Sequence, residues 1–456
     1  MNVALRKFVF AACGVIGVFL IAVAALSCFG LENGVPSDHA CLAVVFFLLM
    51  IVSVLILFFE GFRGGVLLAA LPVIGLAFLL RILNFDRFSW DYIYFLLKWY
   101  YFFQNNGGFS AVASVVSDYN VPYLYFLAFV SYFRIPDLYL IKLLPMVFDV
   151  ILAWGCLRLV RCLRKKSGPD PVVAIAFGAA LLLPTVVLNG SYWGQCDVVY
   201  GALAVHAVAM LLEGRNKTSV ALIGLAFSFK LQAIFILPLW GVAWLAGKIK
   251  FRELLVFPAA YLIVVVPAVL LGRPFLDTIL IYGHQMGEYS WLTMHGASIF
   301  QFLPYSLSGP DGSGPLHDAL AAGGIVVAGC LVLALLFTGF RLREKLDTRA
   351  IFLFGVLLSI GVPFFLPHMH DRYFFLADVL TLCLACYSIR HVPLAVFVQI
   401  SSLIMYLIYF QGGENYRIEM IVSAVFMLVA LVVAVITVFG SLHRSNKADA
   451  AAARLE

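Results

Sequence analysis

Four polar clusters interrupt a sequence that is otherwise almost entirely apolar. They are Asp91 with Asp118 in the aromatic stretch 89–123, the run GSYWGQCDVVY (190–200), Lys230-Leu231-Gln232, and HMHDRY (368–373). A carboxylate can accept a proton from an attacking hydroxyl, and a lysine or arginine can neutralise a departing phosphate. Ionisable groups are costly near lipid and usually serve a site there. The clusters therefore predict group transfer with a phosphate leaving group.

The composition predicts that a membrane surrounds these clusters. Of 456 residues, 64% are hydrophobic and 12% are charged, whereas about a quarter of the residues in a soluble domain are charged. A spanning helix needs about 20 apolar residues, and the polar interruptions divide the sequence into about fourteen segments. We expect an all-α polytopic membrane protein with one integral membrane domain over 1–445. Residues 446–456 are expected to be a cytoplasmic tail or an expression remnant.

The expected helices follow from these divisions. They lie near 8–28, 40–59, 64–81, 139–163, 171–188, 198–212, 218–229, 231–247, 253–271, 319–340, 350–366, 372–389, 392–410 and 417–440. Lysines and arginines favour cytoplasmic loops, and a topology with both termini inside places the basic run after Leu157 in the cytoplasm. The net charge of +6 then reflects membrane insertion rather than binding of nucleic acid. Segments 83–135 and 272–318 are expected to be extracytoplasmic.

Three of the segments are too short to span as written. Segments 218–229 and 231–247 meet at Lys230, and broken helices are tolerated where they line protein or a wet cavity. Segment 121–134 is interpreted as a re-entrant or interfacial helix, because a full span there would move the basic run outside. The aromatic stretch 89–123 belongs at the headgroup level and is interpreted as the active-site platform.

Ordered motifs along the chain carry a family resemblance. SWDY is followed by GGF and SDYNVPYLY, then YWGQCD, FSFKLQAIFILPL and PHMHDRYFF. This order resembles the integral-membrane glycosyltransferases of the GT-C class, with bacterial relatives of the GPI-anchor mannosyltransferases closest in pattern. The resemblance implies a GT-C helical bundle and a polyprenyl-phosphate hexose as donor, with mannose expected before glucose. It also implies an acceptor hydroxyl on a lipid-linked glycan, on a surface polysaccharide or, third, on a protein.

The resemblance assigns roles in the first outer segment. Asp91 corresponds to the general base that deprotonates the acceptor before in-line attack with inversion. Many members have two adjacent acids there, whereas this chain has Asp91-Tyr92. Asp118 and Tyr123 lie in the element SDYNVPY, which resembles a substrate-contacting Asp-Tyr-Pro-Pro-like element. Asp118 also suits a turn or a helix cap, and this alternative stays open.

The HMHDRY motif resembles the class motif near the donor phosphate. It makes His368, His370, Arg372 and Tyr373 candidate donor-binding residues. The motif is also compatible with a membrane-end anchor, in which Arg372 snorkels and Tyr373 joins the aromatic belt. His368, His370 and Asp371 are metal-ligand types, but no fourth ligand is recognisable. We therefore expect no cofactor, with a divalent metal as the lesser alternative.

The two middle clusters supply further candidates for substrate binding. Lys230 is costly in an apolar segment unless it meets an anion such as phosphate. Gln232 can orient a sugar or phosphate, or bond the broken helix. Trp193 offers a flat face for a sugar ring, and Gln195 and Asp197 offer hydrogen bonds to its hydroxyls. An ordinary interfacial turn is the alternative for this run.

The second outer segment, 272–318, contains His284 and Gln285 in an aromatic and polar setting. It is interpreted as a sugar-facing or lipid-facing loop, or as a lid. Cys28 and Cys41 flank the first outer loop, and their pairing cannot be decided from sequence.

The functional prediction is a multi-pass enzyme of the bacterial inner or plasma membrane with a periplasmic site. Two rivals stay open. A transporter or flippase of a polyprenyl-linked sugar would show paired interrupted helices, of which one short pair is visible. A surface-glycan polymerase or ligase would use a lipid-diphosphate donor. Nucleotide sugars are poor candidates, because no nucleotide-binding loop is visible.

Overall fold

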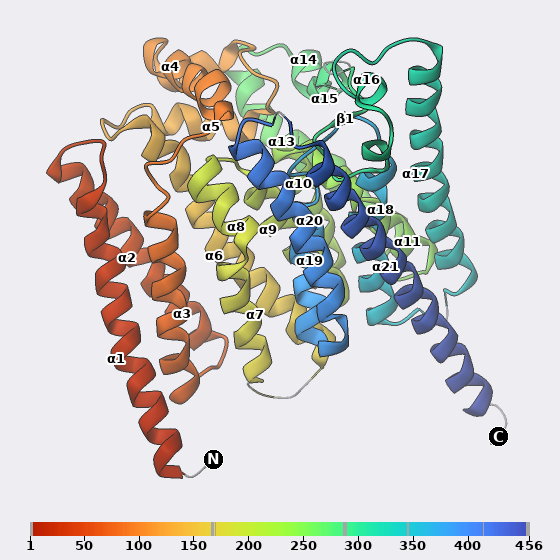
Figure 1. Ribbon diagram of the computed structural model, residues 1–456, viewed down its shortest axis with the longest axis horizontal. Helices are drawn as coiled ribbons and strands as arrows, with labels where there is room; N and C mark the ends of the chain where they lie inside the picture. The colour runs from red at the N-terminus through yellow and green to blue at the C-terminus, as the bar shows by residue number, and fades with distance from the viewer. Residues whose placement is uncertain are drawn as a thin grey trace. The chain divides into compact units, whose positions relative to one another are not determined.

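The computed structural model describes residues 3–165, 168, 170–285, 290–343, 346–413 and 415–452. The chain forms two compact units. Unit 1 comprises Met1–His206, Ser228–Lys230 and Leu262–Tyr282, and unit 2 comprises Ala207–Phe227, Leu231–Tyr261 and Gly283–Glu456. Nearly every element is a helix (Figure 1).

Unit 1 is a bundle of apolar helices with shorter helices at one end (Figure 1). The bundle helices are α1 (Val3–Ser27), α2 (Pro36–Phe59), α3 (Gly65–Ile82), α6 (Asp137–Arg164), α7 (Pro171–Leu182), α8 (Pro184–Val187) and α9 (Asp197–Leu212), which continues into unit 2. The shorter elements are η1 (Cys28–Gly30), the π-helical turn η2 (Tyr92–Leu96), α4 (Leu97–Asn105), η3 (Gly108–Ala113), α5 (Val121–Val130), the π-helical turn η4 (Leu188–Trp193) and α14 (Phe275–Ile279).

Glycine allows α1 and α3 to pack closely. A Cβ atom at Gly17 of α1 would lie 2.3 Å from the Cβ of Leu71, and one at Gly75 of α3 would lie 2.7 Å from the Cβ of Leu20. Small residues let apolar helices approach backbone to backbone in lipid, where there is little hydrophobic driving force between them. Larger side chains at these two glycines would separate the helix pair.

The segment 83–135 is mostly helical rather than an extended loop. It contains η2, α4, η3 and α5 in succession. Asn120 is the N-cap of α5, and its side chain accepts a hydrogen bond from the Val121 amide. Pro122 stands in the first turn, where its missing N–H costs nothing. The short helix predicted over 121–134 is therefore present, ending at Val130.

Unit 2 contains the second set of helices and one short sheet. Its elements are α10 (Asn216–Phe229), η5 (Leu231–Phe235), α11 (Pro238–Leu245), α12 (Phe251–Leu254), α13 (Val256–Leu270), α15 (Ile281–Gln285), β1 (Thr293–Met294), η6 (Ile299–Phe302), α16 (Tyr305–Ser308), α17 (Pro315–Arg341), α18 (Thr348–Phe365), β2 (Met369–His370), α19 (Phe375–Tyr387), η7 (Ile389–His391), α20 (Val392–Phe410) and α21 (Arg417–Ala452), of which α10, α13 and α15 contribute residues to both units. Strands β1 and β2 are parallel, with Thr293 opposite Met369 and Met294 opposite His370.

Two expected helices are interrupted. The segment expected as one helix over 171–188 divides into α7 and the run 184–193, with a 46° bend between them. The break falls at Leu183, because the proline that follows disfavours the helical conformation of the preceding residue. The segment expected over 231–247 begins as the 3-10 turn η5 before α11. Both breaks lie beside polar clusters of the sequence.

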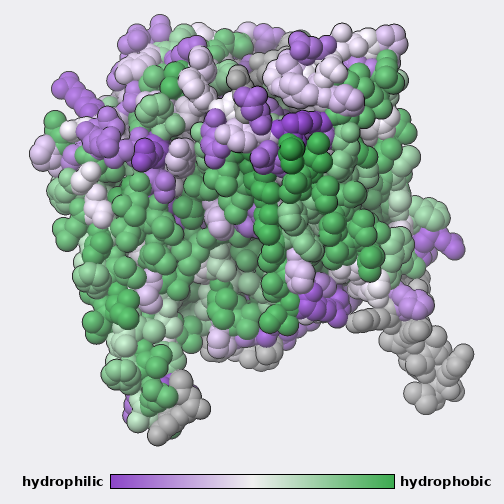
Figure 2. All heavy atoms as spheres, viewed as in Figure 1, coloured by the Kyte–Doolittle hydropathy of each residue, from purple (hydrophilic) through white to green (hydrophobic). Residues whose placement is uncertain are grey.

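The apolar surface confirms an all-α polytopic membrane protein. Within the described residues, nine helices are long and apolar enough to cross a membrane, or ten if the bent pair counts as one span; four shorter apolar helices accompany them. Figure 2 shows hydrophobic side chains along the visible helices and hydrophilic ones gathered toward helix ends. The number of fourteen membrane segments stays a prediction. Cys28 and Cys41 are both free thiols in the structure.

Candidate active site

Asp91 stands at the start of the helix that follows α3. It directly precedes the π-helical turn η2. The hydroxyl of Ser89 accepts a hydrogen bond from the Tyr92 amide over 3.2 Å and donates one to the Trp193 carbonyl over 2.8 Å. Ser89 thus caps the helix of Asp91 and ties it to a second segment. Single π-turns are frequent at functional sites.

The second segment carries Trp193 and Gln195. The turn η4 ends at Trp193, and Gly194 follows with φ 77°, in the left-handed region that favours glycine. The backbone N–H of Gln195 then donates to the backbone carbonyl of Asn189 over 2.9 Å. This reversal of the chain at Gly194 directs the side chains of Trp193 and Gln195 toward Asp91.

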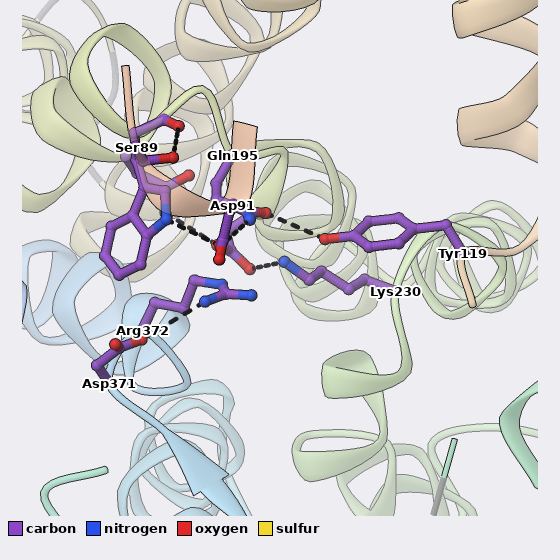
Figure 3. A network of polar contacts seen from close by, with 10 residues as sticks. Ser89, Asp91, Tyr119, Gln195, Lys230, Asp371 and Arg372 are labelled. Carbon is purple, nitrogen blue, oxygen red and sulfur yellow. Dashed lines mark hydrogen bonds and ion pairs between the residues drawn. The ribbon is translucent and has the colours of Figure 1, made fainter. Parts of the chain in front are cut away.

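Both side chains bind the same carboxylate oxygen. Oδ2 of Asp91 accepts a hydrogen bond from Nε1 of Trp193 over 2.9 Å and another from Nε2 of Gln195 over 2.5 Å. Oε1 of Gln195 accepts a third from the Tyr119 hydroxyl over 3.0 Å. Figure 3 shows Asp91, Gln195 and Tyr119 as one chain of hydrogen bonds. Two donors on one oxygen fix the position of a half-buried carboxylate.

A buried ion pair lies in the same unit. Nζ of Lys230 donates to Oδ1 of Asp197 over 2.5 Å, and the Asn189 amide donates to Oδ2 over 2.9 Å. The Lys230 side chain is 7% exposed and that of Asp197 is fully buried. The ammonium also lies 5.7 Å from the ring centroid of Tyr119. A buried cation requires such partners to offset its lost hydration.

Comparison with protein families identifies the class of the chain. The model of glycosyltransferase family 87 matches residues 118–366. The chain belongs to this family. Family 87 enzymes are GT-C-like membrane glycosyltransferases, so the resemblance inferred from the motifs is confirmed at the level of class. A comparison with curated proteins gives no match.

The family 87 match covers part of the site. It includes Tyr119, Gln195, Asp197 and Lys230, whereas Asp91 precedes the matched residues. The HMHDRY motif follows them. The support for a role of Asp91 or of this motif therefore comes from geometry and sequence pattern, and not from the family match.

Five of the predicted site residues lie in one network, in which Tyr119 links the Asp91 group to the ion pair. They are Asp91, Trp193, Gln195, Asp197 and Lys230. Trp193 was expected to offer a face to a sugar ring, but its side chain is fully buried, and its indole contacts Asp91 instead. Asp197 was expected to contact sugar hydroxyls, and here it is paired with Lys230.

Sequence reasoning missed three members of the network: Ser89, Tyr119 and Asn189. Tyr119 follows Asp118, which drew attention by its charge. Asp118 is half-buried, and Asn120 rather than Asp118 caps α5. Neutral hydroxyl and amide side chains do not stand out in an apolar sequence as charged ones do. Only their position beside charged residues, in the motifs SDYN and NGSYWGQCD, could have indicated them.

Tyr123 lies next to Tyr119, a member of this network. It is buried, and its ring centroid lies 5.0 Å from that of Tyr119. Burial raises the pKa of Tyr123 well above its ordinary value. Burial, followed by a 2.8 Å hydrogen bond to Asp137, likewise raises the pKa of Tyr92. Both phenols therefore remain neutral at physiological pH.

The HMHDRY motif is placed within unit 2. His368 adopts φ 63°, and its Nδ1 lies 2.6 Å from the Trp291 carbonyl oxygen. His370 pairs with Met294 in the sheet, and its ring centroid lies 5.0 Å from that of Tyr373. Nη1 of Arg372 lies 3.5 Å from Oδ1 of Asp371 (Figure 3). The short sheet therefore joins the motif to segment 272–318.

The remaining candidates of the glycosyltransferase lie in unit 2. Gln232 is buried, and its Oε1 has no hydrogen-bond partner in the described structure. Gln285 ends α15 and is half-buried, while the side chain of His284 lies outside the described residues. Among the described residues, no group of three or more histidine, cysteine, aspartate or glutamate side chains is arranged to hold a metal ion.

Proposed function

We propose that this family 87 glycosyltransferase is an inverting hexosyltransferase that uses a polyprenyl-phosphate sugar as donor. The acceptor is a hydroxyl of a lipid-linked or surface glycan at the outer face of the membrane. The observation that supports this most directly is Asp91, whose Oδ2 is held by Trp193 and Gln195 in a half-buried position. A general base acts efficiently when it is held within hydrogen-bond reach of the proton that it removes.

The reaction moves one proton and one glycosyl group. The carboxylate of Asp91 takes the proton of the acceptor hydroxyl as that oxygen attacks the anomeric carbon. The bond between this carbon and the phosphate oxygen breaks, and polyprenyl phosphate leaves with the electron pair. Attack from the face opposite the leaving group inverts the anomeric configuration.

Cations stabilise the phosphate that leaves. Lys230 is one candidate for this task, and Arg372, with His368 and His370, is a second candidate. Arginine binds phosphate with paired donors, and lysine acts as a point charge. Lys230 is bonded to Asp197, and a phosphate that binds the ammonium would compete with that carboxylate.

The membrane helices suit a lipid-linked donor. Apolar side chains such as Phe19 and Phe337 are about two-thirds exposed on α1 and α17, at 65% each. A polyprenyl tail can enter sideways from lipid while its phosphate stays near the headgroups. The cation distribution of the sequence supports cytoplasmic termini and a periplasmic site in a bacterial inner membrane. Mannose is the first donor sugar to test, and glucose is the second.

Two rivals fare differently. Membership of a glycosyltransferase family favours an enzyme over a transporter or flippase. A polymerase or ligase that uses a lipid-diphosphate donor would share the outer-face site. It is distinguished by the donor, because its leaving group would be a diphosphate.

The test is a donor panel with the purified full-length enzyme. Mannose and glucose on polyprenyl phosphate and on polyprenyl diphosphate are each incubated with enzyme and membrane extract, and transfer and product anomers are scored. The Asp91→Asn variant is the key control, because the asparagine carbonyl can still accept from Trp193 and Gln195 while its base strength is lost. We expect transfer from a monophosphate donor, inverted product and no transfer by the variant. Wild-type rates in Asp91→Asn would refute the base assignment.

A further inference from the structure

We infer that Lys142, on the membrane helix α6, is a positioning residue for Asp91, because it holds together the two chain segments that form the site. This inference rests on the proposed role of Asp91 as the base. Lys142 lies outside every motif of the sequence. Its Nζ binds one segment, and its apolar stem lies beside the other.

The head binds the turn that leads to Asp91. Nζ of Lys142 donates to the carbonyl of Phe85 over 2.7 Å, to that of Asn84 over 3.3 Å, and to that of Arg87. These residues connect the end of α3 to the helix of Asp91. Nζ meets three backbone carbonyls, so none of its donors is left without an acceptor.

The stem lies beside the turn that carries Trp193 and Gln195. A Cβ atom at Gly194 would lie 3.8 Å from both Cγ and Cε of Lys142, which is the distance of van der Waals contact. Gly194 stands between the two residues that bind Oδ2 of Asp91. One side chain therefore lies between both halves of the site.

The neighbouring turn of α6 strengthens the grip on the first segment. The ring of Tyr139 stacks on Phe85 with centroids 5.4 Å apart and planes 16° apart, and its hydroxyl donates to Asp86. Nζ of Lys142 lies 5.4 Å from the same Phe85 ring. Residues three apart share a helix face, so α6 presents Tyr139 and Lys142 together to this turn.

The hydrogen bonds of Lys142 explain why an apolar side chain of similar length could not replace it. Lys142 is fully buried, and methionine has a similar length but no donors. A buried carbonyl without its donor is costly, so in Lys142→Met the turn 84–87 would shift to find other partners. Asp91 follows this turn by four residues, and a shift of about 1 Å at a reacting group costs about 100-fold in rate.

The experiment compares Lys142→Met with Tyr125→Phe in the full-length enzyme. Tyr125 is also in unit 1, and its hydroxyl donates to the Val264 carbonyl and accepts from the Ala268 amide, so the control loses two hydrogen bonds away from both turns. We expect Lys142→Met to lower kcat at least about tenfold while the donor KM stays within about twofold. The control should keep kcat at a temperature well below both melting transitions.

Hydrogen exchange gives a second measurement that does not depend on turnover. Peptides covering 84–93 and 193–196 should exchange faster in Lys142→Met than in Tyr125→Phe. Unchanged kcat and unchanged exchange in Lys142→Met would overturn the inference, as would equal loss of kcat in the two variants. If Asp91→Asn abolishes transfer while Lys142→Met keeps wild-type kcat, only the positioning role fails. If Asp91→Asn retains activity, the proposed function fails first.

Discussion

The side-chain amide of Gln195 donates a hydrogen bond to Oδ2 of Asp91 over 2.5 Å, across 104 positions of sequence. The orientation of this amide is defined by its other end, where Oε1 accepts from the Tyr119 hydroxyl. A phenol donates to the carbonyl side and leaves the NH₂ side for the carboxylate. The relationship therefore links Asp91 and Tyr119, both in segment 83–135, through Gln195 on the η4–α9 connection.

Replacing this amide by a carboxylate gives the sharpest test of the link. Gln195→Glu would place two carboxylates in contact, and a like charge favours the protonated form of its neighbour. We expect the acid limb of the pH profile of kcat/KM to move to higher pH, with activity partly regained in alkaline buffer. Gln411→Glu, at an exposed helix end, is the control. A profile that does not move in Gln195→Glu would show that this contact does not act on the base.

Trp193 can be assigned by a conservative substitution. Trp193→Phe keeps a buried aromatic ring but removes the Nε1 donor that binds Asp91. We expect kcat to fall about tenfold, the usual scale for one charge-assisted hydrogen bond, and the melting temperature to fall as well, because the smaller ring leaves space in a fully buried site. If Trp193 instead stacked on a sugar ring, kcat would stay near normal in Trp193→Phe, because a phenyl ring also offers a flat face. Near-normal kcat in Trp193→Phe would therefore favour stacking, which in turn requires the ring to become exposed.

Variants of the Lys230–Asp197 pair distinguish an effect on stability from an effect on donor binding. Removing one partner leaves a buried charge, so Lys230→Met and Asp197→Asn should each destabilise the enzyme by about 3 kcal/mol. The double variant should recover part of this loss, because neither charge remains. Donor KM is then measured in the double variant. If it stays at the wild-type value, Lys230 has no part in phosphate binding; we expect it to rise about tenfold.

Arg372 is tested through the donor as well. Arg372→Ala should raise the donor KM about tenfold or more, since hydrogen bonds between charged groups contribute about 1.5–3 kcal/mol. Arg372→Lys should recover part of the affinity, because a point charge replaces a paired donor. Arg341→Ala, which removes an exposed arginine at the end of α17, is the control. Donor kinetics that are identical in Arg372→Ala and the wild type would remove the phosphate assignment.

His295 should make the enzyme less stable in acid. Burial lowers the pKa of His295 below its ordinary value of 6.5. Between the folded pKa and 6.5 the unfolded chain binds a proton that the folded chain does not, so stability falls as the pH drops through this window. His295 has φ 61°, and asparagine tolerates that conformation. His295→Asn should flatten the decrease of melting temperature below pH 6.5, and the exposed His443→Asn should not; equal slopes would exclude His295 as the cause.

The sequence determined the class of this protein and pointed to most residues of the candidate site. Long apolar runs must become helices in lipid, because each backbone polar group has to be satisfied within its own segment. Charged residues such as Asp91, Lys230 and Arg372 stood out because they are costly in such a setting. These signals are local in the chain, and a single sequence is enough to detect them.

Only the tertiary structure decided which of these residues act on each other. Trp193 has a sequence typical of an exposed interfacial ring, yet the reversal at Gly194 buries it against Asp91. Lys230 was expected to bind an anion such as phosphate, whereas in the structure it binds the carboxylate of Asp197, 33 residues earlier. Neutral Tyr119 carries no charge to reveal it. Hydrogen bonds depend on distances of about 3 Å between atoms, and only the folding of the chain sets such distances between remote segments.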